Sequence, residues 1–192
     1  RQMCIRDRNY ASEYAVTKLS SVRNGNEQTL VIGKREGAYK DMPLVRPFKV
    51  KVLSSLIPQS VTVNGHPAKY QYSGEDFALL IDVPAQACDQ EKVVKIVYPS
   101  EKVDLNGLLG ASRRIAKSME QLKYRNSYIV FKEEFGKMGS LSEAVTYAPS
   151  EMPALIADFW KSYNELPAVL ERQGMKSDLA TWFLQSVCWS KR

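Results

Sequence analysis

The pattern of apolar and polar positions changes once along the chain. Up to about residue 99, apolar residues alternate with polar ones in short runs, which is typical of half-buried strands. After Pro99 they recur every three or four positions, which is typical of amphipathic helices. The pattern therefore predicts an α+β fold, with an antiparallel β-sandwich followed by a small helical module.

The first half divides into short strands separated by turns. Asn64-Gly65 is the strongest turn signal because both residues tolerate positive φ, and it predicts that Val61 and Val63 pair antiparallel with residues 69–72. A second turn is expected at residues 73–76. Six or seven short strands with turns between them favour a two-sheet sandwich. The expected strands are 13–20, 28–33, 45–53, 60–64, 67–72, 77–83 and 92–98.

A first helix is predicted after Pro99, with Asp104 as its N-cap. Its apolar face comprises Leu105, Leu108, Leu109, Ile115, Met119 and Leu122. Residues 124–147, which contain Gly136 and Gly139, have a less regular pattern, and no helix is predicted there.

Two further helices are predicted near the C-terminus. One has Ser150 as its predicted N-cap, and Pro167 is expected to end or kink it. Its wide apolar stripe comprises Leu155, Ile156, Phe159, Trp160, Tyr163 and Leu166. The last helix follows Ser177 or Asp178 and turns inward Leu179, Trp182, Phe183 and Val187. Trp160, Trp182 and Trp189 could stack on sugars, but their helical spacing beside Leu and Phe favours core packing.

Composition and charge narrow the classes of partner. The chain has 192 residues, of which 44% are hydrophobic and 25% charged, as in ordinary globular proteins. The net charge of +6 divides into 14 cations against 10 acids in residues 1–100 and 13 against 11 afterwards, without a basic block. A mixed-sign solvated surface is therefore favoured, and no nucleic-acid partner is expected. No apolar run approaches the roughly 20 residues of a membrane span.

The first eight residues, RQMCIRDR, fit no neighbouring pattern and resemble a translated adaptor sequence. We expect them to be an artefactual leader, Cys4 included, and exclude them from the fold prediction; we also expect the chain to be a fragment whose N-terminal part is missing. The remaining residues divide into a sandwich over 9–99 and a helical extension over 100–192. Cys88 and Cys188 are too far apart in sequence to indicate a metal or redox motif, so buried or half-buried free thiols are expected.

The sequence contains no residue pattern to which a catalytic, cofactor-binding or metal-ligating role can be assigned. His66 follows a turn, has no evident Ser or Cys partner, and is expected to be exposed. Two acidic pairs, Glu75 with Asp76 and Glu133 with Glu134, are expected to be solvated. Residues 33–37 lack the Lys-Ser/Thr of a phosphate loop and open no helix, which argues against nucleotide binding. No cofactor is expected.

One stretch carries a resemblance to a known family. The string IGKREGAYKDMPLVRPF contributes Ile32, Gly33, Gly37, Tyr39, Met42, Arg46 and Phe48. Residues 10–17, YASEYAVT, and 60–70, SVTVNGHPAKY, follow the same family's pattern, although Ser12 and Glu13 depart from its usual Gly-Glu order. Residues 9–99 thus resemble the C-terminal β-domain of glycoside hydrolase family 31, the α-glucosidases and α-xylosidases.

The resemblance implies a parent enzyme that hydrolyses α-linked glycosides with two aspartates of a (β/α)8 barrel. The barrel would be this chain's partner within the same polypeptide. This chain would then be connected with a carbohydrate substrate only through the parent enzyme. The sandwich is an accessory domain in that family, whose bacterial members are often exported to the cell envelope. Residues 100–192 lie outside the family's common core. A freestanding carbohydrate- or protein-binding module is the main alternative, and a self-contained enzyme is the third.

Overall fold

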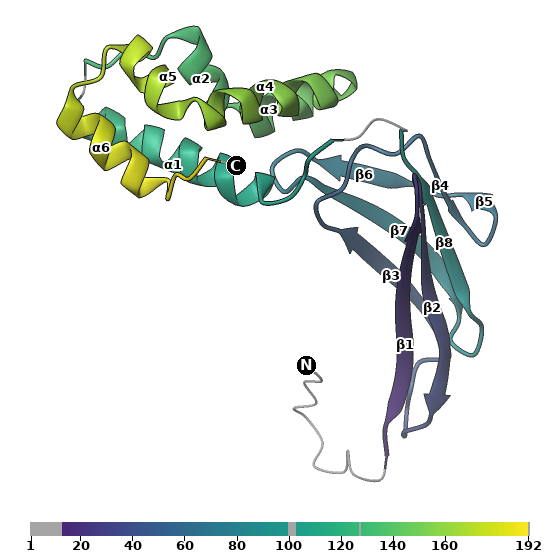
Figure 1. Ribbon diagram of the computed structural model, residues 1–192. Coiled ribbons are helices and arrows are strands. Elements are labelled where there is room, and N and C mark those ends of the chain that lie inside the picture. Colours follow the sequence, from purple (N-terminus) through teal and green to yellow (C-terminus); the bar gives the residue numbers. More distant parts are fainter. Residues whose placement is uncertain (1–12, 100–102, 127, 192) are drawn as a thin grey trace. The chain divides into compact units, whose positions relative to one another are not determined.

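The computed structural model describes residues 13–99, 103–126 and 128–191 (Figure 1). The predicted leader 1–8, Cys4 and residues 10–12 of the family-like run therefore lie outside the described residues. The described chain forms two compact units. The first takes residues 13–51, Pro58–Gln71 and 80–99, and the second takes Val52–Ile57, Tyr72–Leu79 and the described residues from 103 onward.

The strands form two sheets. The larger sheet has the order β1-β2-β8-β4-β5 and the smaller one the order β3-β7-β6. Antiparallel sheets followed by helices confirm the predicted α+β class. The strands are β1 (Ala15–Asn24), β2 (Glu27–Gly37), β3 (Val45–Val52), β4 (Ser60–Val63), β5 (His66–Pro67), β6 (Tyr70–Ser73), β7 (Ala78–Ala87) and β8 (Lys92–Val97).

The predicted pairing of Val61 and Val63 with residues 69–72 is wrong. Val63 pairs with His66 across the Asn64-Gly65 turn, and β4 pairs along its other edge with β8. The single strand expected at 67–72 is two strands, because β6 belongs to the other sheet. Pro67 has no N–H to donate to a ladder, so a short strand ending there is physically reasonable.

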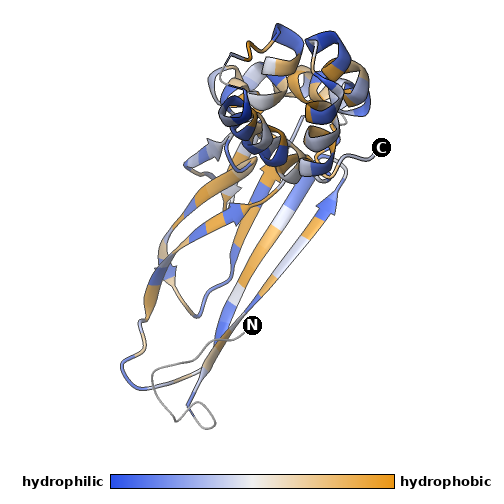
Figure 2. Ribbon diagram, turned by 90° about the vertical axis from the view of Figure 1, so that its left-hand side faces the viewer, coloured by the Kyte–Doolittle hydropathy of each residue, from blue (hydrophilic) through white to orange (hydrophobic). Residues whose placement is uncertain are grey.

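Alternation of hydrophobic and hydrophilic residues along the strands is visible in Figure 2. In β8 the inward side chains of Val94 and Ile96 are fully buried, while Lys95 between them is exposed and pairs with Glu27 at 3.4 Å. β8 lies between β2 and β4, so its neighbours cover both edges. This central position explains why an apolar alternation of only six residues forms a well-buried strand.

The second unit contains six α-helices and one 3-10 turn among the described residues. These are α1 (Leu108–Arg125), α2 (Glu133–Gly139), α3 (Leu141–Tyr147), η1 (Pro149–Glu151), α4 (Met152–Asn164), α5 (Leu166–Gln173) and α6 (Ser177–Ser186). The last helix starts as predicted, and α4 ends before Pro167, also as predicted. Pro167 then lies in the first turn of α5, where its missing N–H costs no helical hydrogen bond.

Both predicted N-caps are wrong. The cap of α1 is Gly107 in the left-handed region, at φ 69°, and Asp104 instead accepts a hydrogen bond from the backbone N–H of Asn106 at 3.0 Å. The cap of α4 is Glu151 rather than Ser150, because Pro149–Glu151 form the 3-10 turn before the helix. Neither cap residue makes a side-chain cap hydrogen bond, so a search for capping side chains misplaces both starts.

Residues 124–147 contain two helices that the sequence does not predict. Phe135 and Met138 are buried in α2, and Leu141 and Val145 in α3. A Cβ added to Gly139 would lie 2.6 Å from the sulfur of Met119, so the glycine allows α2 to approach α1 closely. Of the two glycines that make this stretch appear irregular, Gly139 thus reflects close packing.

Gly37 offers a local test of the sandwich. Its φ is +87°, and an added Cβ would lie 2.3 Å from the carbonyl oxygen of Tyr14. We expect Gly37→Ala to lower the free energy of unfolding by about 1–3 kcal/mol more than Gly25→Ala does. Gly25 shares the positive φ, at +60°, but has nothing within 4 Å of its Cβ position. Urea unfolding of both variants measures the difference, and equal losses would contradict the close approach.

Candidate functional site

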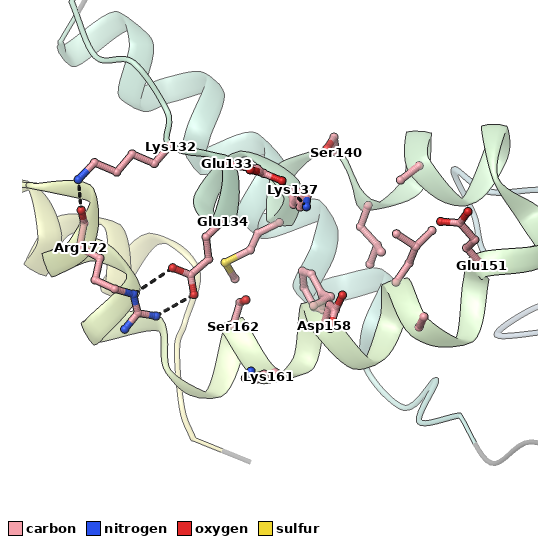
Figure 3. A pocket seen from close by; sticks show the side chains of 16 residues that line it. Lys132, Glu133, Glu134, Lys137, Ser140, Glu151, Asp158, Lys161, Ser162 and Arg172 are labelled. Carbon is pink, nitrogen blue, oxygen red and sulfur yellow. Dashed lines mark hydrogen bonds and ion pairs between the residues drawn. The ribbon is translucent and has the colours of Figure 1, made fainter.

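The candidate site is a groove between helices of the second unit, which we call the helical unit from here on. It has a volume of about 1040 Å³ and is lined by residues of α2, α3, α4 and α5, with flanking positions (Figure 3). Its charged members are Lys132, Glu133, Glu134, Lys137, Glu151, Asp158, Lys161 and Arg172. Ser140 and Ser162 add hydroxyl groups, and the apolar members are Met138, Leu141, Ala144, Ala154, Leu155 and Phe159. The groove therefore joins an apolar floor to a rim of both charge signs.

Two ion pairs organise the rim. Lys137 contacts Glu133 one turn earlier on α2, with the ammonium nitrogen 2.5 Å from the carboxylate oxygen. Arg172 of α5 makes a two-point contact with Glu134, in which Nη2 and Nε lie 2.7 and 3.0 Å from the two carboxylate oxygens. Lys132 donates from its ammonium group to the carbonyl oxygen of Arg172. These contacts tie α2 to α5 along one end of the groove (Figure 3).

The ion pairs set the protonation of the two glutamates. Hydrogen bonding to Lys137, and then its charge, lowers the pKa of Glu133. Hydrogen bonding to Arg172 is the main cause that lowers the pKa of Glu134. A general acid that works near neutral pH needs a raised carboxyl pKa. Glu133 and Glu134 are therefore suited to binding cations and poorly suited to protonating a glycosidic oxygen.

The pair between Glu134 and Arg172 predicts a pH dependence of stability. Because the folded-state pKa of Glu134 is lowered, the pair stabilises the fold above the ordinary carboxyl value of 4.5 and is lost as the pH falls through the lower folded value. We expect Glu134→Gln to be less stable than the parent at pH 7 by up to about 1 kcal/mol and to converge with it as the pH falls below 4.5 through the lowered folded-state pKa. Thermal unfolding from pH 3 to 7 measures this, and a constant offset across that range would contradict it.

The other acidic pair is only partly as predicted. Glu75 is exposed, but Asp76 is half-buried and lies 2.6 Å from the guanidinium of Arg113. The expectation that Asp76 is a solvated turn carboxylate is therefore wrong, since it links the 73–76 turn to α1 within the second unit. His66 is exposed in β5, as predicted.

The three tryptophans are half-buried and engaged in packing. Trp160 donates its indole N–H to the carbonyl oxygen of Asp104 at 2.7 Å, and Trp189 donates to that of Tyr163 at 2.7 Å. Trp182 packs beside Phe183 and beneath the guanidinium of Arg125, which lies 4.3 Å from a ring centroid. These contacts favour the predicted packing role over sugar stacking.

The residues that carry the family resemblance lie on β2, the following loop and β3. Ile32 is 4% exposed in the core, and Gly37 ends β2 beside Tyr14. Phe48 packs beneath two cations, with Arg46 and Lys92 at 5.7 and 5.8 Å from the ring centroid. Sequence reasoning missed Lys92, which is 1% exposed and donates to the carbonyl oxygens of Ala87 and Gln90 at 2.6 Å.

The two described cysteines are free thiols. Cys88 is buried, as predicted, whereas Cys188 is exposed just after α6, so the prediction for Cys188 is wrong. Over the described ranges, no three His, Cys, Asp or Glu side chains gather in a way that could hold a metal ion. None of the helices in the described part combines the length and hydrophobicity needed to cross a bilayer.

Comparison with known proteins gives matches to solved structures alone. No family model matches the sequence, and no curated protein matches it. The chain is similar to two structures of a GH31 dextranase of Flavobacterium johnsoniae, one a mutant complexed with isomaltotriose and the other complexed with glucose. In each case the TM-score is 0.41 and the identity 17%, over 47% of this chain. The matched part is 13% of the dextranase chain.

Proposed function

We propose that this chain is a non-catalytic C-terminal accessory part of a family 31 glycoside hydrolase. Its sandwich, residues 9–99, packs against and supports a catalytic barrel of the same polypeptide. The helical module, residues 100–192, is an extension of that domain. Hydrolysis of α-linked glycosides, such as α-glucosides or α-xylosides, then belongs to the full-length enzyme.

The observation that carries the proposal is the role of the family-like residues. Ile32 fills the core, Gly37 permits the close approach to Tyr14, and Phe48 packs against Arg46 and Lys92. Each of these contributions is structural, because each forms or fits the β2–loop–β3 unit. A motif that maintains a scaffold is what an accessory domain requires.

The groove carboxylates add support. Retaining glycosidases place two carboxyl groups about 5 Å apart, one of them with a raised pKa. Glu133 and Glu134 are instead held by Lys137 and Arg172, which lower their pKa values. This arrangement favours a supporting role over a catalytic one.

Recovery of the coding sequence upstream of this chain tests the proposal. We expect a (β/α)8 barrel with two catalytic aspartates, and α-glucosidase or α-xylosidase activity in the full-length protein. Deletion of the sandwich and helices from that protein should lower its thermal stability and its yield of active enzyme. An unrelated upstream domain, or full stability after the deletion, would contradict the proposal.

The freestanding binding module remains the alternative. Calorimetric titration of the purified chain with maltotriose and isomaltotriose distinguishes the accessory-domain hypothesis from the binding-module hypothesis. The accessory role predicts no heat of binding at millimolar sugar, whereas a carbohydrate-binding module predicts saturable binding.

A further inference from the structure

We propose that the groove of the helical unit is a docking site for an amphipathic α-helix of a partner protein, bound antiparallel to α4. The helix would turn an apolar stripe toward the groove floor, with acidic residues in its first turn and basic residues in its last. This inference goes beyond the proposed glycosidase role and does not depend on it.

The shape of the groove suits a helix of about three turns. Positions 151, 154, 155, 158, 159, 161 and 162 line it. They recur at helical spacing and so lie along one face of α4 and its N-cap. From Glu151 to Ser162 this face is about 16 Å long at 1.5 Å per residue. The opposite wall comes from α2 and α3.

The floor of the groove is apolar and partly uncovered. Met138, Leu141 and Phe159 form its buried base, while Ala144 and Leu155 are half-buried and Ala154 is exposed. The two alanines leave room for a backbone to approach, and Leu155 offers a contact for larger apolar anchors. An amphipathic helix presents such anchors at positions i, i+3, i+4 and i+7.

The charges on the rim favour one kind of bound helix and one orientation of it. Lys132, Lys161 and Arg172 gather toward one end, where Arg172 pairs with Glu134 and, at 3.7 Å, with Glu165. Glu151 lies at the other end, with Asp158 between it and Lys161 (Figure 3). Glu133 and Lys137 neutralise each other. The rim therefore runs from net positive to net negative along α4.

An ordinary amphipathic helix has a matching order of charges, because acidic residues favour the first turn of a helix and basic residues the last. Its acidic first turn faces Lys132 and Lys161 when it lies antiparallel to α4, and its basic last turn then faces Asp158 and Glu151. The two helix dipoles are also antiparallel in this arrangement. Glu151 and Lys161 complement the dipole of α4 itself, but Lys132 and Arg172 lie on other segments and extend the gradient.

Two peptides of identical composition test the proposal. Both carry the same apolar stripe over 14 residues with blocked termini. One has Glu in its first turn and Lys in its last, and the other has the two sets exchanged. Titration of the labelled chain, followed by amide chemical shifts, should show the first peptide binding at least about tenfold more tightly. The shifts should centre on Ala144, Ala154 and Leu155.

Reversing two charges of the groove tests whether the rim causes the preference between the peptides. The double variant Glu151→Lys with Lys161→Glu should remove most of the preference between the peptides, because it cancels the charge difference between the two ends of the groove. The control double variant, Glu120→Lys with Lys191→Glu, reverses exposed charges outside the groove and should leave the preference unchanged. Circular dichroism verifies that both variants remain folded.

Several outcomes would overturn the proposal. These are no shifts at 1 mM peptide, equal affinity for the two peptides, or a preference that the groove variant does not change. Sedimentation showing a dimer in which a second copy covers the groove would also overturn it.

Discussion

Phe183→Ala should lower the free energy of unfolding of the helical unit by about 3–5 kcal/mol. Phe183 of α6 is 0% exposed, and its ring lies 5.2 Å from that of Phe135 in an edge-to-face contact. Truncation removes that contact and leaves a cavity between α6 and α2 that the neighbouring helices fill only partly. The pair thus joins two helices that are far apart in sequence.

Chemical denaturation followed by tryptophan fluorescence measures this loss. Tyr128→Ala is the control, because Tyr128 is 92% exposed and its truncation should change stability by less than about 0.5 kcal/mol. Similar losses in the two variants would mean that Phe183 does not occupy the core described.

Gly74→Ala should also lower the free energy of unfolding of the second unit, by about 1–3 kcal/mol. An added Cβ would lie 2.2 Å from the hydroxyl oxygen of Thr146 and 2.6 Å from the carbonyl oxygen of Ser142. The hydroxyl can rotate away, but the backbone carbonyl cannot, so the turn at residues 73–76 must move off α3. Both segments belong to the second unit.

Gly139→Ala is the matched comparison. Its Cβ would also make a short contact, 2.6 Å from the sulfur of Met119, but that atom ends a flexible side chain. We therefore expect a markedly smaller loss than for Gly74→Ala. The double variant Gly74→Ala with Thr146→Ala should recover only part of the stability, since the carbonyl of Ser142 remains. Full recovery would contradict the account of the Ser142 contact.

The elements that the sequence predicts are those whose pattern is local. β8 and α6 follow from alternation and helical spacing, which depend on neighbouring residues. The break between β5 and β6 is not local, because it depends on which sheet each segment joins. The helices α2 and α3 are hidden by Gly136 and Gly139, because glycine disfavours helix locally. At Gly139 the glycine reflects close packing against Met119 of α1, which the local sequence does not show.

The groove is harder to predict from the sequence than any single helix or strand. Its lining spans residues 132–172 and comes from four helices, of which the sequence predicts only α4 as a separate helix. Glu133 and Glu134 were noticed as an acidic pair, but their partners Lys137 and Arg172 become evident only with α2 and α5 in place. Buried Lys92 gives no sequence signal either, because a lysine inside an alternating strand normally indicates an exposed position.

The most direct test of the central claim, that this chain supports chemistry performed elsewhere, is hydrolysis of aryl α-glucosides and α-xylosides by the purified 192-residue chain. The claim predicts release of the aryl alcohol no faster than in buffer, from pH 4 to 8. Turnover by the chain that is abolished by Glu133→Gln, Glu134→Gln or Asp158→Asn would contradict it.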